Sequence, residues 1–239
     1  MRKILLSVIT LLVLISILMS GKVYAADISI GATTWYSWWD YNSEGEGDTD
    51  IDPTFLYGPA LSVKFNDDFN LTFVYLYGKF DMEEKYEDNG VLEIEKSKIK
   101  RSDSDLALNY RLNDYFKVFA GAKYMSFWNA GFDHSGIGPG VGLSATYPLS
   151  ENLFLLGTFS GFYLWGHEED KNGDHDSDFK EYGFNSTLSL AYYIASASTT
   201  VSLGGRFQYV KADYDESFKD NLKNKFYGIT LTATYSFSL

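Results

Sequence analysis

The last 13 residues of the chain alternate between two kinds of side chain without exception. The odd-numbered positions are apolar: Tyr227, Ile229, Leu231, Ala233, Tyr235, Phe237 and Leu239. The residues between them are glycine, threonine and serine. This alternation predicts a β-strand with one apolar face and one face of small polar side chains. In a soluble sheet the apolar face would be turned inward, whereas in a membrane barrel it would contact lipid and the small polar face would line the lumen.

The start of the chain has the features of a secretory signal peptide. Arg2 and Lys3 are basic, residues 4–19 are almost wholly apolar, and Val23-Tyr24-Ala25 has the form of a cleavage site. We therefore predict a signal peptide over 1–25 and a mature barrel domain over 26–239. The alternative is a membrane-anchoring helix, for which the apolar segment is short.

Composition excludes several classes of function. The net charge is −12, and it becomes −15 once the three cations of residues 1–25 are removed. A nucleic-acid partner is not expected, because binding to phosphates requires a basic surface. The chain contains no cysteine, so its stability cannot come from disulfide bonds.

The rest of the mature chain reads as nine further strands, joined alternately by short turns and long connections. With the final strand, the predicted set is 27–41, 55–66, 69–82, 100–112, 115–127, 137–149, 153–166, 180–194, 199–211 and 225–239. Three short-turn segments resemble one another: KFNDDFNLTF, YRLNDYFKVF and YPLSENLFLL. Such serial hairpins predict a closed barrel. An eight-stranded barrel is the alternative, if 69–82 and 100–112 belong to an outer structure.

Aromatic residues gather at both ends of the predicted strands. Rings favour the interfacial level of a bilayer, so two aromatic belts are expected in a membrane barrel. The predicted girdle comprises Trp35, Trp38, Trp39, Trp128 and Trp165 beside the long connections, and Tyr110, Tyr147, Tyr235 and Phe237 beside the short turns.

These features together resemble the bacterial outer-membrane β-barrel proteins, a porin-like superfamily of small barrels. In that family the terminal strand is recognised by the barrel-assembly machinery, and most members end on Phe, whereas this chain ends Phe237-Ser238-Leu239. The resemblance implies an all-β antiparallel transmembrane barrel of about ten strands, with short periplasmic turns and long acidic extracellular loops. It also implies a Gram-negative outer-membrane location, with outer-membrane lipids and lipopolysaccharide as partners. The alternative is a soluble β-sandwich or lipocalin-like barrel with its apolar face inward.

Charged and amide side chains on the inward face are the first functional candidates. The predicted lumen-lining residues are Lys64, Lys79, Asp105, Arg111, Lys117, Lys123, Glu181, Asn185, Arg206 and Gln208. Charges inside a narrow barrel must pair or be hydrated. Two interpretations follow, namely a narrow polar conduit for small solutes or ions, and a plug of internal ion pairs that gives the barrel a structural role.

The acidic connections are the second candidates. Oxygen ligands stand at alternate positions in one of them, as hard cations prefer: Asp170, Asn172, Asp174, Asp176 and Asp178. These residues are a weak candidate site for divalent cations, because the pattern of a calcium-binding loop is incomplete. The simpler interpretation is a solvated acidic surface. A surface-binding or adhesin-type barrel that uses acidic, aromatic-rich loops remains an alternative.

Hydrolysis at the barrel rim is the third alternative. Some outer-membrane barrels are proteases or lipid A deacylases, and both kinds use histidine. The three histidines, His134, His167 and His175, fall in predicted loops rather than on strands that would fix their geometry. We therefore expect no enzymatic activity, no catalytic residue and no cofactor.

Overall fold

The computed structural model describes residues 26–43, 49–88, 91–171, 176–214 and 222–238. Its strands are β1 (Asp27–Ser43), β2 (Thr49–Ile51), β3 (Thr54–Lys64), β4 (Phe69–Asp88), β5 (Val91–Arg111), β6 (Phe116–Trp128), β7 (Phe132–Pro148), β8 (Leu153–Asp170), β9 (Ser177–Ile194), β10 (Thr199–Tyr214) and β11 (Leu222–Ser238). One short 3₁₀ turn, η1 (Ala195–Ala197), joins β9 to β10. Within the described part of the chain, no helix is long and apolar enough to cross a membrane.

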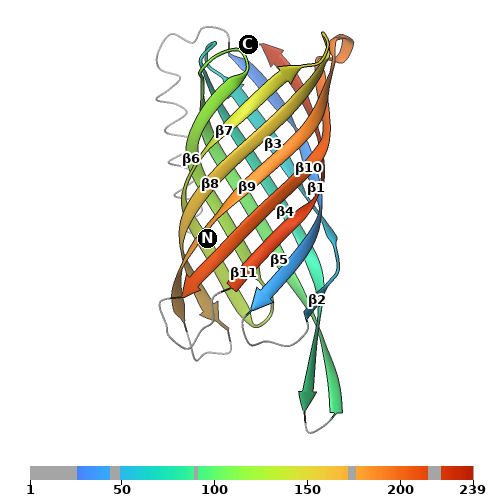
Figure 1. Ribbon diagram of the computed structural model, residues 1–239, viewed down its shortest axis with the longest axis vertical. Helices are drawn as coiled ribbons and strands as arrows, with labels where there is room; N and C mark the ends of the chain where they lie inside the picture. Colours follow the sequence, from blue (N-terminus) through green and yellow to red (C-terminus); the bar gives the residue numbers. More distant parts are fainter. Residues whose placement is uncertain (1–25, 44–48, 89–90, 172–175, 215–221, 239) are drawn as a thin grey trace.

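Ten of these strands form a closed antiparallel barrel (Figure 1). The ring runs β1, β3, β4, β5, β6, β7, β8, β9, β10, β11 and back to β1, while the short β2 pairs with β4. The alternating C-terminal segment forms β11, which pairs with both β10 and β1 and so completes the ring. Inner-face hydroxyls meet across this closing seam: the Oγ atoms of Ser29 and Ser236 are 2.8 Å apart, and the Oγ1 atoms of Thr33 and Thr232 are 2.7 Å apart.

The short turns lie together at one end of the barrel, which we call the short-turn end; we call the opposite end the loop end. Two of the turns share one construction. The side-chain oxygen of Asn66 accepts hydrogen bonds from the backbone N–H groups of Asp68 and Phe69, and Asn113 does the same for Tyr115 and Phe116. Asparagine favours such local bonds, which explains why the two turns have similar sequences.

The strands extend much further than the sequence patterns predicted. Residues 83–88 and 91–99, predicted as part of a connection, belong to β4 and β5, whose hairpin projects beyond the loop end (Figure 1). This part of the loop prediction is wrong because charged residues stand at both odd and even positions of this segment, so no apolar alternation in the sequence marks it as strand. The same hairpin continues into the barrel wall through the β3–β4 and β5–β6 pairings, which settles the strand number at ten.

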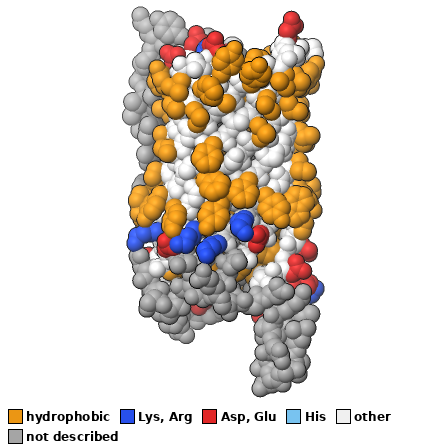
Figure 2. Space-filling model, viewed as in Figure 1, with side chains coloured by type: hydrophobic (Ala, Val, Ile, Leu, Met, Phe, Trp, Pro, Cys, Tyr) orange, Lys and Arg blue, Asp and Glu red, His pale blue; other side chains and the backbone are white. Residues whose placement is uncertain are grey.

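The apolar face of the barrel is its outer face. Val141 and Leu188 are 60% and 59% exposed, and many other large apolar side chains share this surface (Figure 2). The soluble alternative predicted the opposite arrangement. An apolar exterior is the arrangement of a membrane barrel.

Seven of the predicted girdle residues lie on this outer surface. Near the loop end Trp38 stacks on Tyr227, Trp128 packs against Tyr77, and Trp165 packs against Tyr163. Near the short-turn end lie Tyr110, Tyr147, Tyr235 and Phe237.

The girdle prediction is wrong for Trp35 and Trp39, which are buried inside the barrel. Successive side chains of a strand point to opposite faces, so Trp38 and Trp39 cannot both face outward. The inward set on β1 is Thr33, Trp35, Ser37 and Trp39.

Candidate functional site in the barrel lumen

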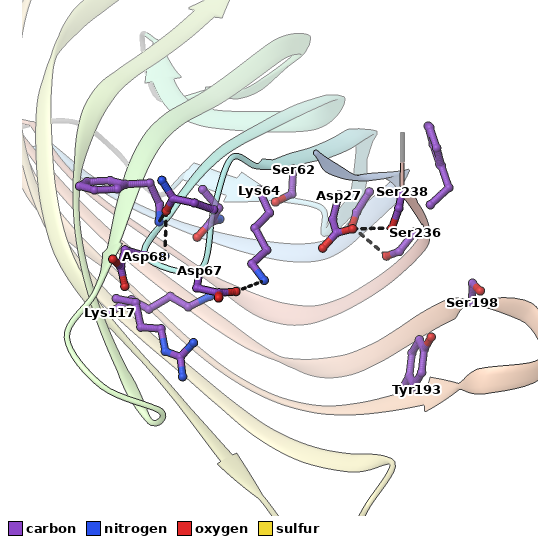
Figure 3. A pocket seen from close by; sticks show the side chains of 16 residues that line it. Asp27, Ser62, Lys64, Asp67, Asp68, Lys117, Tyr193, Ser198, Ser236 and Ser238 are labelled. Atoms are coloured by element: carbon purple, nitrogen blue, oxygen red, sulfur yellow. Dashed lines mark hydrogen bonds and ion pairs between the residues drawn. The ribbon is translucent and has the colours of Figure 1, made fainter. Parts of the chain in front are cut away.

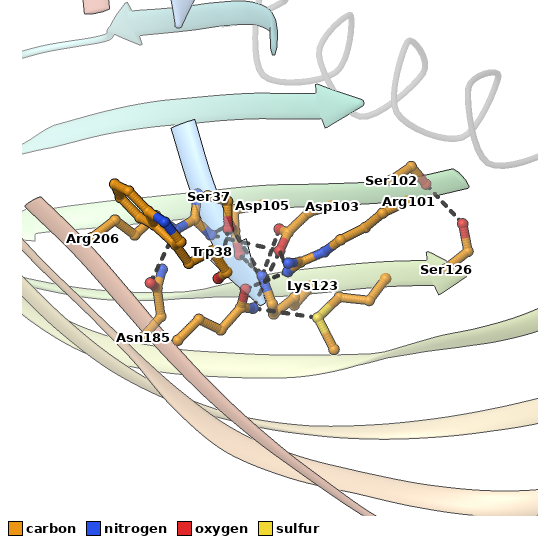
Figure 4. Close-up of polar contacts among 12 residues, drawn as sticks. Ser37, Trp38, Arg101, Ser102, Asp103, Asp105, Lys123, Ser126, Asn185 and Arg206 are labelled. Carbon is orange, nitrogen blue, oxygen red and sulfur yellow. Dashed lines mark hydrogen bonds and ion pairs between the residues drawn. The ribbon is translucent and has the colours of Figure 1, made fainter. Parts of the chain in front are cut away.

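A network of buried charges lies inside the lumen (Figure 4). Its centre is Asp103 on β5, whose carboxylate lies 2.7 Å from the Lys123 ammonium and 3.0 Å from the Arg101 guanidinium. The Arg206 guanidinium lies 3.6 Å from Asp103 and 3.6 Å from Asp105. Three cations therefore share two carboxylates, and Asp103 is the carboxylate that contacts all three.

This network crosses the barrel from wall to wall. Arg101 on β5 donates a hydrogen bond to the side-chain oxygen of Gln208 on β10, and Gln208 donates one to Asp103 over 3.2 Å. Strands β5 and β10 are five places apart in a ring of ten, so they face each other across the lumen. The polar side chains consequently bridge the full width of the barrel instead of lining an open path.

Aromatic rings pack against the charged network. Phe226 on β11 stacks on Phe127 of β6 at 5.9 Å between ring centroids, and these two strands also face each other across the ring. Trp39 packs on both rings, at 5.2 Å and 5.4 Å. The Arg101 guanidinium lies 3.5 Å from the centre of the Phe226 ring, which is a cation–π contact. The Nε and Nη1 nitrogens of this guanidinium are buried and have no hydrogen-bond partner among the described residues.

A second cluster surrounds His134 closer to the loop end. This histidine is buried on β7; its Nδ1 lies 2.8 Å from Glu168 and its Nε2 lies 3.0 Å from Glu181. Phe179 stacks flat on the imidazole at 3.9 Å, and the hydroxyl of Tyr214 donates a hydrogen bond to Glu168. Both ring nitrogens are occupied by carboxylates, so the arrangement holds an imidazolium in place and leaves no nitrogen free to act as a base.

A glycine makes the stacking on His134 feasible. Gly166 on β8 lies opposite Phe179, and a Cβ atom there would come within 2.1 Å of the Phe179 ring and 2.6 Å of the Ser135 carbonyl oxygen. Only glycine leaves the space that the ring occupies. The ring can therefore lie over the strand and cover His134.

The expectation that all histidines lie in loops is wrong for two of them. His134 belongs to β7, and His167 belongs to β8, where it is half exposed and bonds to Asp178 at 2.8 Å. The strands extend past the last apolar residues, which is why the sequence pattern placed these positions in loops. His175 lies outside the described residues.

Nine of the ten predicted lumen residues have inward-facing side chains. Lys123, Glu181, Arg206 and Gln208 are buried; Lys64, Asp105, Arg111, Lys117 and Asn185 are partly exposed. The prediction is wrong for Lys79, which is exposed on the outer face, because Leu76, Gly78 and Phe80 are the inward residues of that part of β4.

The sequence patterns missed Arg101 and Asp103, which are central to the network. A signal for both residues exists: they continue the odd-numbered inward set of Asp105, Asn109 and Arg111 toward the loop end. The predicted strand begins at residue 100, but its apolar alternation starts only at Leu106. Arg101 and Asp103 precede that alternation, so the pattern does not assign them to the inward face.

The candidate cation residues do not form a metal cluster in the described part of the chain. Asp176 and Asp178 lie beside His167, at 3.8 Å and 2.8 Å, and Asp170 ends β8. Asn172 and Asp174 lie outside the described residues, so the cation prediction is not tested for the full set.

Comparison with solved structures identifies the class to which this fold belongs. The outer-membrane protease OmpT from Escherichia coli superposes with a TM-score of 0.54 at 14% identity, covering 89% of this chain and 96% of that chain. The β domain of the Bordetella autotransporter BrkA gives a TM-score of 0.46 at 10% identity, covering 89% and 98%. No protein-family model and no curated protein matches the sequence. The chain thus has the fold of the bacterial outer-membrane β-barrels, and at this identity the likeness concerns the fold alone.

Proposed function

We propose that the protein is an outer-membrane barrel whose lumen is closed by its own side chains, and that its role is structural rather than porin-like. The outward apolar surface and the two aromatic zones support a position in a bilayer. The predicted signal peptide supports export. Outer-membrane lipids, lipopolysaccharide and the barrel-assembly machinery, acting on β11, are the partners that this proposal entails.

The observation that carries the proposal is the hydrogen bond between Arg101 and Gln208 across the lumen. A conduit requires a continuous hydrated path, as in the larger porins. Here the charged network and the stack of Phe127 on Phe226 lie against each other, because Arg101 contacts both rings. Ions would have to displace buried, mutually paired side chains to pass.

Planar-bilayer recording tests this proposal directly. The purified full-length protein should incorporate into membranes, change its gel mobility on boiling as folded barrels do, and give no steady conductance. Steady single-channel steps from every folded preparation would refute closure of the lumen and support a narrow polar conduit instead. Recovery in the soluble fraction after export would contradict the membrane position.

Surface binding is a second candidate, because the β4–β5 hairpin projects from the barrel and β2 adds a third strand to it. Its described charges include Lys96 paired with Glu83 and Lys98 paired with Asp81 at 3.1 Å. A closed barrel that presents a projecting hairpin is suited to contact other molecules. Loss of surface binding after deletion of the hairpin tip, in a barrel that still folds, would support this role.

One structural neighbour is an outer-membrane protease, which makes hydrolysis worth testing. We expect His134→Gln to leave peptidase and lipase readings at background, because both imidazole nitrogens are already engaged by glutamates.

The same substitution should lower the temperature at which the barrel unfolds, since Glu168 and Glu181 lose a shared cation. The matched control is His167→Gln, which removes a half-exposed histidine and should leave the unfolding temperature unchanged. A hydrolytic rate that His134→Gln abolishes would establish an enzyme.

A further inference from the structure

The lumen opens into a cavity of about 530 Å³ between the charged network and the short-turn end (Figure 3). We call this cavity the short-turn cup. Hydroxyl and amide groups from several strands line it, among them Ser29, Ser62, Asn70 and Ser236. Its volume falls within the range of small-molecule sites in proteins.

Three cations reach the short-turn cup, and two of them already have partners in the turns. The Lys64 ammonium lies 2.8 Å from Asp67, and it lowers the pKa of that carboxyl below its ordinary value. Arg111 pairs with Asp114. Both carboxylates are in exposed turns, where an ion pair contributes little to stability and exchanges readily.

Lys117 differs from the other two. It projects from β6 into the short-turn cup, and no carboxylate of the described residues lies within ion-pairing distance of its ammonium. Its cross-strand neighbour on β5 is another cation, Arg111. A partly buried ammonium beside a guanidinium lacks a counter-charge, and a bound anion would supply one.

The carboxylates of the short-turn cup limit what can bind there. Asp27 accepts a hydrogen bond from the Ser238 hydroxyl, and Asp67 and Asp68 belong to the turn beside Lys64. Their negative charge disfavours a polyanion. A small ligand with one anionic group and hydrogen-bonding substituents fits both the free cation and the hydroxyl-lined wall.

We propose that the short-turn cup is a binding site for a small carboxylate- or phosphate-bearing solute, with Lys117 as its principal counter-ion and Arg111 as a second donor. Arg111 can turn from Asp114 to the ligand without leaving a buried charge unpaired, because Asp114 is exposed. The short-turn cup and its charges are present whether or not the lumen is closed above them.

Labelling with pyridoxal 5′-phosphate tests the site in the folded full-length protein in detergent micelles. The reagent carries a phosphate, which Arg111 would hold, and an aldehyde; the neutral amine of Lys117 condenses with the aldehyde to an imine with loss of water, and borohydride reduces the imine to a stable secondary amine. Mass spectrometry should find Lys117 labelled several-fold more than the more exposed Lys98. Inorganic phosphate or acetate should protect Lys117 and leave Lys98 unchanged.

The two competitors distinguish the ligand chemistry. Protection by phosphate alone supports a phosphate-bearing ligand, protection by acetate alone supports a carboxylate, and protection by both supports a site that accepts either anion. If Lys98 is labelled more than Lys117, as its greater exposure alone would predict, and neither ion protects Lys117, the proposed binding site is refuted.

Two variants complete the test. Lys117→Gln should remove the protected label, whereas the matched variant Lys98→Gln should retain it. If Lys117→Gln does not fold, as judged by the shift in gel mobility on boiling, the protection measured on the unaltered protein decides the question. If the protein conducts and Lys117 is protected, the lumen is open and the binding site stands. If the protein does not conduct and Lys117 is not protected, the lumen is closed and the binding site is refuted.

Discussion

Replacing Arg101 and Phe226 by serine is expected to turn a non-conducting barrel into a conducting one. The Arg101 guanidinium bridges to Gln208 on the opposite wall and lies over the Phe226 ring. Removing both side chains deletes a cross-lumen hydrogen bond and one ring of the aromatic stack. The charge balance of the network improves, because Lys123 and Arg206 then face two carboxylates. The polar residues that remain would hydrate, and single-channel recording in planar bilayers should detect discrete steps.

The matched control removes the same kinds of side chain from outside the lumen. Phe184 packs against Phe159 and Phe207 on the outer surface, and Lys98 is exposed on the projecting hairpin. The double variant Phe184→Ser and Lys98→Ser should remain silent. If both double variants fold and both stay silent, side chains other than Arg101 and Phe226 close the lumen. If the lumen variant does not fold, Phe226→Ser alone should give smaller steps.

The barrel itself was predictable from local patterns. The alternation of Ile229, Leu231 and Tyr235 with small polar residues fixes which face of β11 is apolar, and that face is outward in the structure. The repeated asparagine turns at Asn66 and Asn113 fix where the hairpins reverse. Both features depend on residues that are close in sequence, so a single sequence contains them.

The lumen was predictable only in part, because its contacts join strands on opposite walls. Arg101 and Gln208 are 107 residues apart, and their contact depends on the relative shift of every strand between them. Trp35 and Trp39 were assigned to the interface by residue type, although strand parity places them with the inward Thr33 and Ser37. The odd or even position of a residue in a strand decides which face its side chain occupies, since a one-residue shift moves it to the other face.

The strand ends were the least predictable part. Residues 83–99 carry charges on both faces, so neither alternation nor hydrophobicity identifies them as strand. Residues 83–88 pair with residues 91–96 through a ladder that continues the barrel wall. His134 was misplaced for the same reason, because β7 begins at Phe132, before its apolar alternation starts.

Asp103→Asn is expected to destabilise the barrel more than any other single substitution in the charged network. Asp103 is almost completely buried and contacts Arg101, Lys123 and Arg206. Without its charge, Lys123 and Arg206 would pair with Asp105, and the buried Arg101 would lose its carboxylate contact. Removing one partner from a buried ionic network costs about 3–5 kcal/mol, because the remaining charges stay desolvated and repel one another. Urea unfolding of the protein reconstituted in lipid vesicles, followed by tryptophan fluorescence, should show this loss.

Asp105→Asn provides the matched comparison, because the chemistry of the change is identical and the environment differs. The Asp105 side chain is 37% exposed; its ion pair with Lys123 is longer than that of Asp103, at 3.1 Å against 2.7 Å, and its pair with Arg206 has the same length, 3.6 Å. Water can solvate the neighbouring cations once the Asp105 charge is removed. The free energy of unfolding should therefore fall by much less for Asp105→Asn than for Asp103→Asn. Equal losses would mean that the lumen is hydrated around both carboxylates. That result would weaken the case for a closed barrel, since a network accessible to water on both sides of Asp103 would not seal the lumen.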